Sequence, residues 1–129
     1  MDDEIINKYT EEARARWGNT EAFKQAEERV KKMGKDGLQK VLGENGMITE
    51  AISQSMKDGE DPRSDYVQKL VNKHYNGLRV FYEPNLKLYR GLAEMYVDDP
   101  RFRANYEKVA PGLAQFLHDA MIYYIDTQE

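Results

Sequence analysis

Apolar residues recur at intervals of three and four along almost the whole chain, which is the spacing of one face of an α-helix. A first stripe covers about residues 3–17. A second stripe, capped by Asn19 or Thr20, continues to the glycines Gly34 and Gly37, which mark its end. Strand-like alternation of β-branched and polar residues is missing. The pattern therefore predicts an all-α protein.

The next stripe predicts a third helix over residues 38–56, followed by a loop over residues 57–64. Gly43 and Gly46 lie inside this third helix. Because glycine weakens a helix interior, a break or kink at these two positions is an open alternative. The loop ends at Ser64, a residue type that caps helix N-termini well.

A fourth helix, over about residues 65–82, has the broadest apolar face and should be central to the fold. Pro84 interrupts the helical pattern, because proline cannot continue the backbone hydrogen bonds. A fifth helix ends just before Asp99, which caps a short sixth helix. The last helix follows Gly112, so that about six to seven helices are expected in total.

The apolar residues are unevenly distributed. Residues 1–37 contain eight large apolar or aromatic residues, whereas residues 66–97 contain sixteen. Ordering the backbone costs roughly 1–2 kcal/mol per residue, which so few apolar side chains cannot offset alone. The chain of residues 1–129 is thus expected to be a single domain, in which residues 1–37 form a mobile helical lid on a core of residues 38–129.

Composition narrows the class of protein. The 129 residues include no cysteine, which removes disulfides, thiolate catalysis and cysteine-bound metals. A net charge of −4 argues against direct binding of DNA or RNA. The acidic N-terminus lacks the plan of a signal peptide, and no apolar run is long enough to cross a bilayer. A cytoplasmic protein with no membrane contact is expected.

Catalytic and metal-binding motifs are missing from the sequence, so neither an enzyme nor a cofactor is predicted. The two histidines, His74 and His118, are too far apart in the sequence to suggest a metal site. His118 lies among polar residues and is expected at the surface. His74 lies on the apolar side of the fourth helix, where it is either a hydrogen-bonded core residue or a polar anchor in a ligand cavity.

The nine tyrosines are the unusual feature of the composition. Tyr75 and Tyr82 are seven residues apart on the fourth helix, and Tyr89 and Tyr96 are seven apart on the fifth. This spacing fits an aromatic core seam between two helices. It also fits the walls of a cleft for large apolar compounds with scattered polar groups, because buried tyrosines need hydroxyl partners that leucine or phenylalanine would not. A mobile lid carrying Trp17 would close such a cleft.

Four stretches together resemble a known family. They are RARWGNTEAFKQ (residues 14–25), MKDGEDPRSDYVQKLVNKH (residues 56–74), FYEP (residues 81–84) and the stretch over residues 89–124, in which GLAEMYVDDPRF is the most specific part. These stretches are similar to the TipAS antibiotic-recognition domain, the effector half of a branch of MerR-type transcription activators. The resemblance covers nearly the whole chain.

The resemblance implies a globin-like helical fold that binds a hydrophobic antibiotic or drug, thiopeptide-like or other, in a hydrophobic cleft. It also implies N-terminal helices that become ordered when the ligand binds. DNA would be contacted only through a MerR-type DNA-binding domain, which this chain does not contain. Carried over by residue, the resemblance implies a ligand-binding set of Trp17, His74, Phe81, Tyr82, Pro84, Tyr89, Leu92 and Tyr96.

Two positions depart from the family pattern. Thiopeptide-capturing members have a cysteine where this chain has Pro84, so a covalent adduct with the ligand is not expected. Leu38 replaces the usual tryptophan at the start of the third helix. The leading hypothesis is non-covalent drug binding, either as the sensing domain of an activator or as a stand-alone drug-sequestering protein.

Two other classes of protein are alternatives. A tyrosine-rich helical surface also suits a protein-interaction or dimerisation module. A haem-type cofactor protein is suggested only by the globin-like architecture and by His74, and architecture alone is a weak guide to function.

Overall fold

The computed structural model describes residues 20–128, in which the regular secondary structure is helical and no strand is present. The elements are α2 (Glu21–Lys57), α3 (Asp65–Gly77), the 3-10 turn η1 (Leu78–Val80), α4 (Leu86–Asp98), α5 (Pro100–Val109) and α6 (Leu113–Gln128). The predicted all-α class is confirmed. The helix predicted over residues 3–17 lies outside the described residues.

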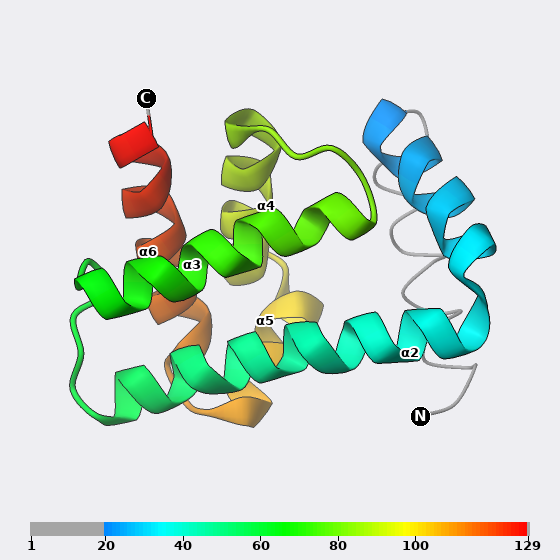
Figure 1. Ribbon diagram of the computed structural model, residues 1–129. Coiled ribbons are helices and arrows are strands. Elements are labelled where there is room, and N and C mark those ends of the chain that lie inside the picture. The colour runs from blue at the N-terminus through cyan, green and yellow to red at the C-terminus, as the bar shows by residue number, and fades with distance from the viewer. Residues whose placement is uncertain (1–19, 129) are drawn as a thin grey trace.

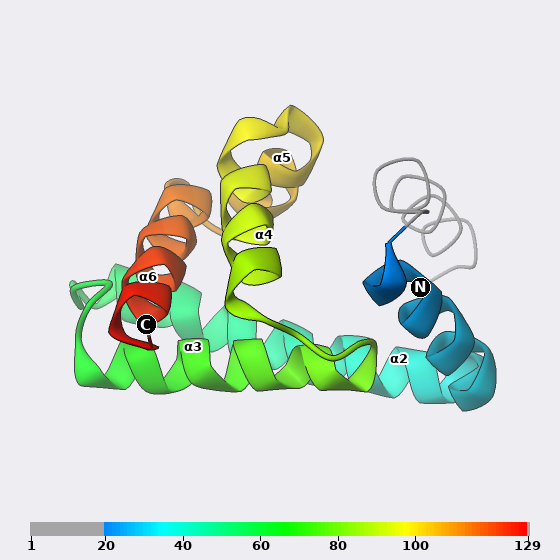
Figure 2. The same ribbon diagram turned by 90° about the horizontal axis from the view of Figure 1, so that it is seen from above.

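The helices are arranged in two crossing layers. The C-terminal part of α2 and α3 run side by side across the front of the molecule, and α4 and α6 cross behind them (Figure 1). The view from above shows α4, α5 and α6 rising from the layer that α2 and α3 form (Figure 2). The α4–α6 pair has the most extensive contact between helices. The N-terminal part of α2 stands at the opposite end of the molecule from α6.

A bend at Gly34 divides α2 into two segments. The backbone of Gly34 has φ 74° and ψ 178°, a conformation that only glycine adopts readily, whereas Gly37, Gly43 and Gly46 remain helical. The predicted end of the second helix at Gly34 is therefore confirmed, because α2 consists of two helical segments that meet there. The alternative of a break at Gly43 or Gly46 is wrong, since both residues are helical. We refer to the first part, residues 21–33, as the lid segment.

Three of the predicted helix starts are correct. Thr20 caps α2 by accepting a hydrogen bond from the amide of Phe23 at 3.2 Å. Ser64 caps α3 in the same way. Asp99 caps α5, with proline in the first turn. Each cap satisfies an amide that has no partner within its own helix.

The predicted fourth helix, over about residues 65–82, extends too far. The α-helix ends at Gly77 instead of Tyr82, and the chain tightens into η1. Gly77 packs closely against α2, since a Cβ added to it would lie 3.2 Å from the side-chain oxygen of Asn45. The amides of Phe81 and Tyr82 both bond to the carbonyl of Leu78 at 2.9 Å, which turns the chain towards α4.

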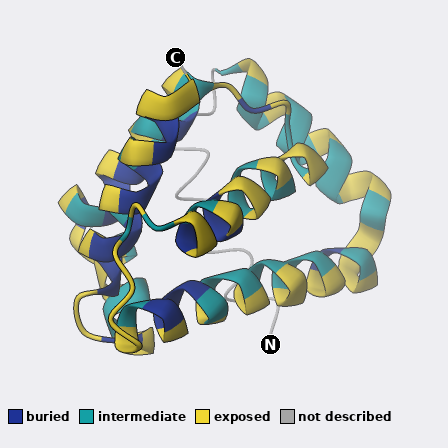
Figure 3. Ribbon diagram, turned by 60° about the vertical axis from the view of Figure 1, so that its left-hand side comes forward, coloured by how far each residue is buried: buried dark blue, intermediate teal, exposed yellow. Residues whose placement is uncertain are grey.

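Burial is concentrated away from the lid segment (Figure 3). None of residues 20–37 is fully buried, and the first buried residue along the described chain is Leu38. Eight residues of α6 are buried. The cluster of buried side chains comprises Ile52, Val67, Leu70, Val71, Tyr89, Ala93, Met95, Tyr96, Ala110, Leu113, Phe116, Leu117, Ala120, Met121, Tyr124 and Ile125.

Candidate ligand-binding site

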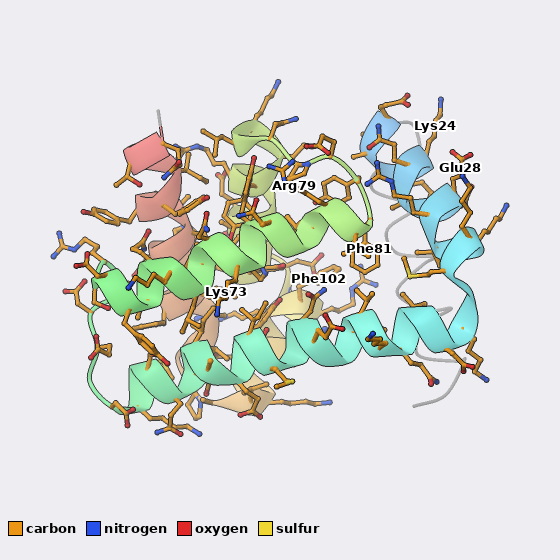
Figure 4. All side chains as sticks on the ribbon, viewed as in Figure 1. Lys24, Glu28, Lys73, Arg79, Phe81 and Phe102 are labelled. Atoms are coloured by element: carbon orange, nitrogen blue, oxygen red, sulfur yellow. The ribbon has the colours of Figure 1, made fainter. Side chains whose placement is uncertain are left out.

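The linker between η1 and α4 carries three of the predicted site residues. Phe81 and Tyr82 are half-buried, whereas Pro84 is buried. In Figure 4, Phe81 lies beyond the end of α3 on the side that faces α2, and Phe102 of α5 is seen in the opening between α2 and α3. The linker therefore places large aromatic side chains at the edge of the core, where they are not fully covered.

Two hydrogen bonds join the lid segment to this region. The side-chain oxygen of Gln25 accepts from the amide of Glu83 at 3.0 Å, and Arg29 donates to the carbonyl oxygen of Arg79 at 2.6 Å. Both bonds end on the main chain near the linker. Arg79 also pairs with the carboxylate of Glu83 and lies 6.0 Å from the ring centre of Tyr75. A polar clasp thus holds the lid segment against η1 and the linker.

His74 bonds directly to one of the predicted tyrosines. Its Nδ1 lies 2.7 Å from the hydroxyl oxygen of Tyr89, and its ring centre is 5.6 Å from that of Tyr89 and 6.5 Å from that of Tyr96. Burial lowers the pKa of His74 to about 4, so the imidazole is neutral at pH 7. His74 therefore contributes a hydrogen bond and no charge.

Tyr89 and Tyr96 are 1% and 7% exposed, so both belong to the core in this conformation. Burial raises the pKa of each hydroxyl well above its ordinary value, and neighbouring tyrosine hydroxyls add to the effect. Tyr96 also packs on Tyr106 with ring centres 4.7 Å apart. Both hydroxyls keep their protons at neutral pH and can act as hydrogen-bond donors.

Four of the predicted residues come together. The hydroxyl of Tyr82 is close enough to influence the pKa of both Tyr89 and Tyr96, and His74 lies between those two rings. We refer to His74, Tyr82, Tyr89 and Tyr96 as the His–Tyr cluster. The expected seam is present where Tyr75 meets Tyr89 edge to face at 4.9 Å.

The remaining predicted residues are more dispersed. Phe81 is adjacent to the cluster in sequence, and Leu92 is half-buried against the core on α4. Trp17 lies outside the described residues, so its predicted role stays a prediction.

Several residues that contact the His–Tyr cluster or the linker were not predicted as site residues. Tyr124 of α6 packs on Tyr75 and Tyr89 and donates to the side chain of Asn72 at 2.6 Å. Tyr106 of α5 packs on the cluster. The i,i+4 spacing of Phe102 and Tyr106 was the available signal for α5. Gln25 and Arg29 are also four residues apart on α2. Their spacing did not predict a contact with the linker, because polar residues on a helix are usually solvated.

Two shallow depressions lie elsewhere on the surface. One, of about 610 Å³, is formed by α2 and the end of α5 and includes Gly46, Met47 and Val109. The other, of about 350 Å³, includes His118 and Asp126 of α6. The side chain of His118 is 23% exposed, so the expected surface position is only partly realised. Neither depression contains a residue of the predicted site.

The described residues have neither a metal-binding cluster nor a membrane-spanning helix. No group of three histidine or acidic side chains between residues 20 and 128 is placed to hold a metal ion. Within the same range, no helix is long and apolar enough to cross a membrane.

Comparison with protein families decides the identity of the domain. The model of the TipAS antibiotic-recognition domain matches residues 9–124. The chain belongs to the TipAS family.

The curated relatives of this TipAS domain are transcription regulators. It is 33% identical over 117 residues to the HTH-type transcriptional activator TipA of Streptomyces coelicolor, a match that covers 90% of this chain and 46% of the relative. It is 31% identical over 122 residues to the HTH-type transcriptional activator mta of Bacillus subtilis, covering 94% of this chain and 46% of the relative. The chain thus spans about half the length of these relatives.

A solved TipAS structure has the same fold. The TipAS protein of Streptomyces lividans, described in complex with nosiheptide as part of a thiopeptide antibiotic multidrug resistance system, matches with a TM-score of 0.84 and 32% identity. The match covers 95% of this chain and 86% of that one. The globin-like TipAS arrangement is therefore confirmed.

Proposed function

We propose that this TipAS domain binds bulky, partly apolar antibiotics without forming a covalent bond. The ligand would contact the lid segment, the linker at Phe81 and Tyr82, and the His–Tyr cluster. The observation that carries the proposal is the likeness in sequence and fold to the TipAS protein solved with nosiheptide.

The side chains at this place suit such a ligand. Phe81 and Tyr82 are half-buried, so part of each ring is free to stack on a compound. The lid segment adds an apolar stripe whose members are likewise only half-buried, namely Phe23, Ala26, Val30 and Met33. Large rings with few rotatable bonds provide contact area at a small entropic cost.

The chemistry of the chain supports reversible binding. There is no cysteine anywhere in the sequence, and a buried proline occupies position 84. Thiol addition to a reactive ligand is therefore ruled out, and affinity must come from apolar contact and hydrogen bonds.

The proposed biological role is that of the sensing domain of a MerR-type transcription activator. The curated relatives are activators of about twice the length, and their name assigns them a helix-turn-helix. Under this proposal the domain binds a ligand, catalyses no reaction and works in the cytoplasm. DNA is contacted only through a DNA-binding domain outside residues 1–129.

Thermal unfolding in the presence of an antibiotic panel that includes nosiheptide tests the binding. A ligand at 100 times its Kd adds about 2.7 kcal/mol of stability, which corresponds to roughly 10 °C in Tm for a domain of this size. Phe81→Ala should weaken the affinity about tenfold, whereas Tyr66→Ala, a change at a 56% exposed tyrosine on α3, should leave it unchanged. The proposal fails if no compound shifts Tm, above all if the protein then self-associates with concentration.

A further inference from the structure

The hydrogen bond between His74 and Tyr89 fixes which of its two partners donates. Tyr89 is 1% exposed, and the Nδ1 of His74, at 2.7 Å, is the partner of its hydroxyl among the described residues. The phenol keeps its proton at neutral pH, and a buried O–H group that donates to nothing is costly. Tyr89 therefore donates and Nδ1 accepts, which places the proton of the neutral imidazole on Nε2.

The Nε2–H group of His74 then has no partner of its own. Among residues 20–128 it makes no hydrogen bond, although His74 as a residue is only half-buried and its ring packs near those of Tyr89 and Tyr96. A donor beside aromatic rings that residues 20–128 leave without an acceptor is suited to an acceptor on a bound molecule.

We propose that Tyr89 is a positioning residue that holds His74 as a neutral Nε2–H donor, and that this donor binds an uncharged acceptor on the antibiotic, such as an azole nitrogen or an amide carbonyl. That the acceptor belongs to an antibiotic rests on the proposed function. The tautomer of His74 rests on the hydrogen bond alone. A neutral donor brings no positive charge to the site, so it selects azole and amide acceptors without favouring carboxylates.

The tautomer is read directly from long-range ¹H–¹⁵N spectra of the whole chain labelled at histidine. At pH 7 the Nε2 of His74 should have the shift of a protonated ring nitrogen and Nδ1 that of an unprotonated acceptor. Tyr89→Phe should abolish this fixed pattern while far-ultraviolet circular dichroism stays helical. A proton on Nδ1 of the wild-type protein, or a wild-type pattern that Tyr89→Phe leaves unchanged, overturns the proposal.

Affinity for nosiheptide tests the use of the donor. His74→Leu should weaken binding about tenfold or more, because the ligand's acceptor loses its partner. His74→Gln retains one group that accepts from Tyr89 and one that donates to the ligand, so it should bind within about threefold of wild type. His118→Leu, at the other histidine, should have no effect.

These outcomes separate the two proposals. If the wild-type protein shows no affinity for nosiheptide or any other antibiotic tested, the proposed function fails, and the spectra still decide the role of Tyr89. If nosiheptide binds but His74→Leu binds within twofold of wild type, the donor has no part in recognition and this inference is wrong.

Discussion

The lid segment and the α4–α6 pair are both helical, yet they are held in place by different forces. Eight residues of α6 are buried, whereas the lid segment has none. Within the described part of the chain, the attachments of the lid segment include the hydrogen bond that Gln25 accepts from Glu83, the one that Arg29 donates to Arg79, and half-buried side chains. Because exposed hydrogen bonds contribute only about 0.5–1.5 kcal/mol each, the lid segment should open locally long before the α4–α6 pair unfolds.

This difference is consistent with the proposed function. A rigid part can hold the His–Tyr cluster in one geometry, while a weakly docked part can move aside for a large ligand and close over it. The free energy of binding then includes the cost of docking the lid segment, which lowers the apparent affinity. The four predictions that follow test the contrast, starting with the largest effect.

Truncating a core side chain should have the largest effect. Leu117 is 1% exposed within α6, so Leu117→Ala should lower the free energy of unfolding by about 2–5 kcal/mol. Val30→Ala in the lid segment, where the side chain is half-buried, should cost less than about 1 kcal/mol. Urea unfolding followed by circular dichroism measures both. Similar losses in the two variants would contradict the contrast.

Substitution of Gly34 at the bend should have the second-largest effect, and it should affect the lid segment without affecting α6. Gly34→Ala forces a side chain into φ 74°, ψ 178°, at a cost of about 1–3 kcal/mol, although no atom lies near the added Cβ. Gly43→Ala meets equally open space in a helical conformation and should stabilise α2 by up to about 1 kcal/mol. Hydrogen exchange should show faster opening of the lid segment in Gly34→Ala only, with α6 unchanged. Equal exchange in both variants would show that the bend is not constrained.

Acid should weaken the joint between α5 and α6. The carboxylate of Glu107 accepts from the amides of Gly112 and Ala114 at 3.0 and 3.1 Å, and these bonds lower its pKa. Its stabilising contribution is complete above the pKa of the unfolded chain and is lost as the pH falls through the lowered pKa of the folded protein. Glu107→Gln should be about 0.5–1 kcal/mol less stable than wild type at pH 7.

The difference between Glu107→Gln and wild type should shrink as the pH falls from 7 towards 3, as measured by urea unfolding over this pH range. Glu44→Gln, on the exposed surface of α2, serves as the control and should follow wild type at every pH. A constant difference between Glu107→Gln and wild type down to pH 3 would exclude the capping role.

Breaking the polar clasp should have the smallest effect on global stability. Arg29→Met removes the bond to the carbonyl of Arg79 and should speed local exchange in the lid segment about threefold to tenfold, equivalent to about 0.6–1.4 kcal/mol. Tm should change by no more than about 2 °C. Lys32→Met, on the exposed side of the same segment, is the matched control. If Lys32→Met has the same effect, the clasp has no specific role.

Much of the fold could be predicted because its signals are local. Thr20, Ser64 and Asp99 cap helices through hydrogen bonds to residues two or three positions away, and the sequence contains both partners. The end of the second helix was predicted at Gly34 or Gly37, and the structure places it at Gly34. The sequence left a break at Gly43 or Gly46 open, because an isolated glycine weakens a helix without always ending it. The end of α3 at Gly77 was missed because the apolar spacing continues to Tyr82, whereas the close approach of Gly77 to Asn45 of α2 joins residues that are far apart in the sequence.

The candidate site could be predicted in part. The seven-residue spacing of tyrosines identified Tyr89 and Tyr96, and the apolar setting of His74 pointed to a hydrogen-bonded side chain. The hydrogen bonds of Gln25 and Arg29 join residues that are 58 and 50 positions apart in the sequence. Both bonds end on main-chain atoms, so no pattern of side chains predicts them. Tyr124 likewise joins the aromatic group only because α6 packs against α3 and α4.

Residue-resolved hydrogen exchange with and without saturating nosiheptide tests the central claim most directly. The lid segment, residues 21–33, should exchange quickly in the free protein and gain at least tenfold protection with ligand bound, while residues 113–128 of α6 stay protected throughout. Unchanged protection of the lid segment in a protein that demonstrably binds nosiheptide would contradict the account, as would an equal gain across both regions.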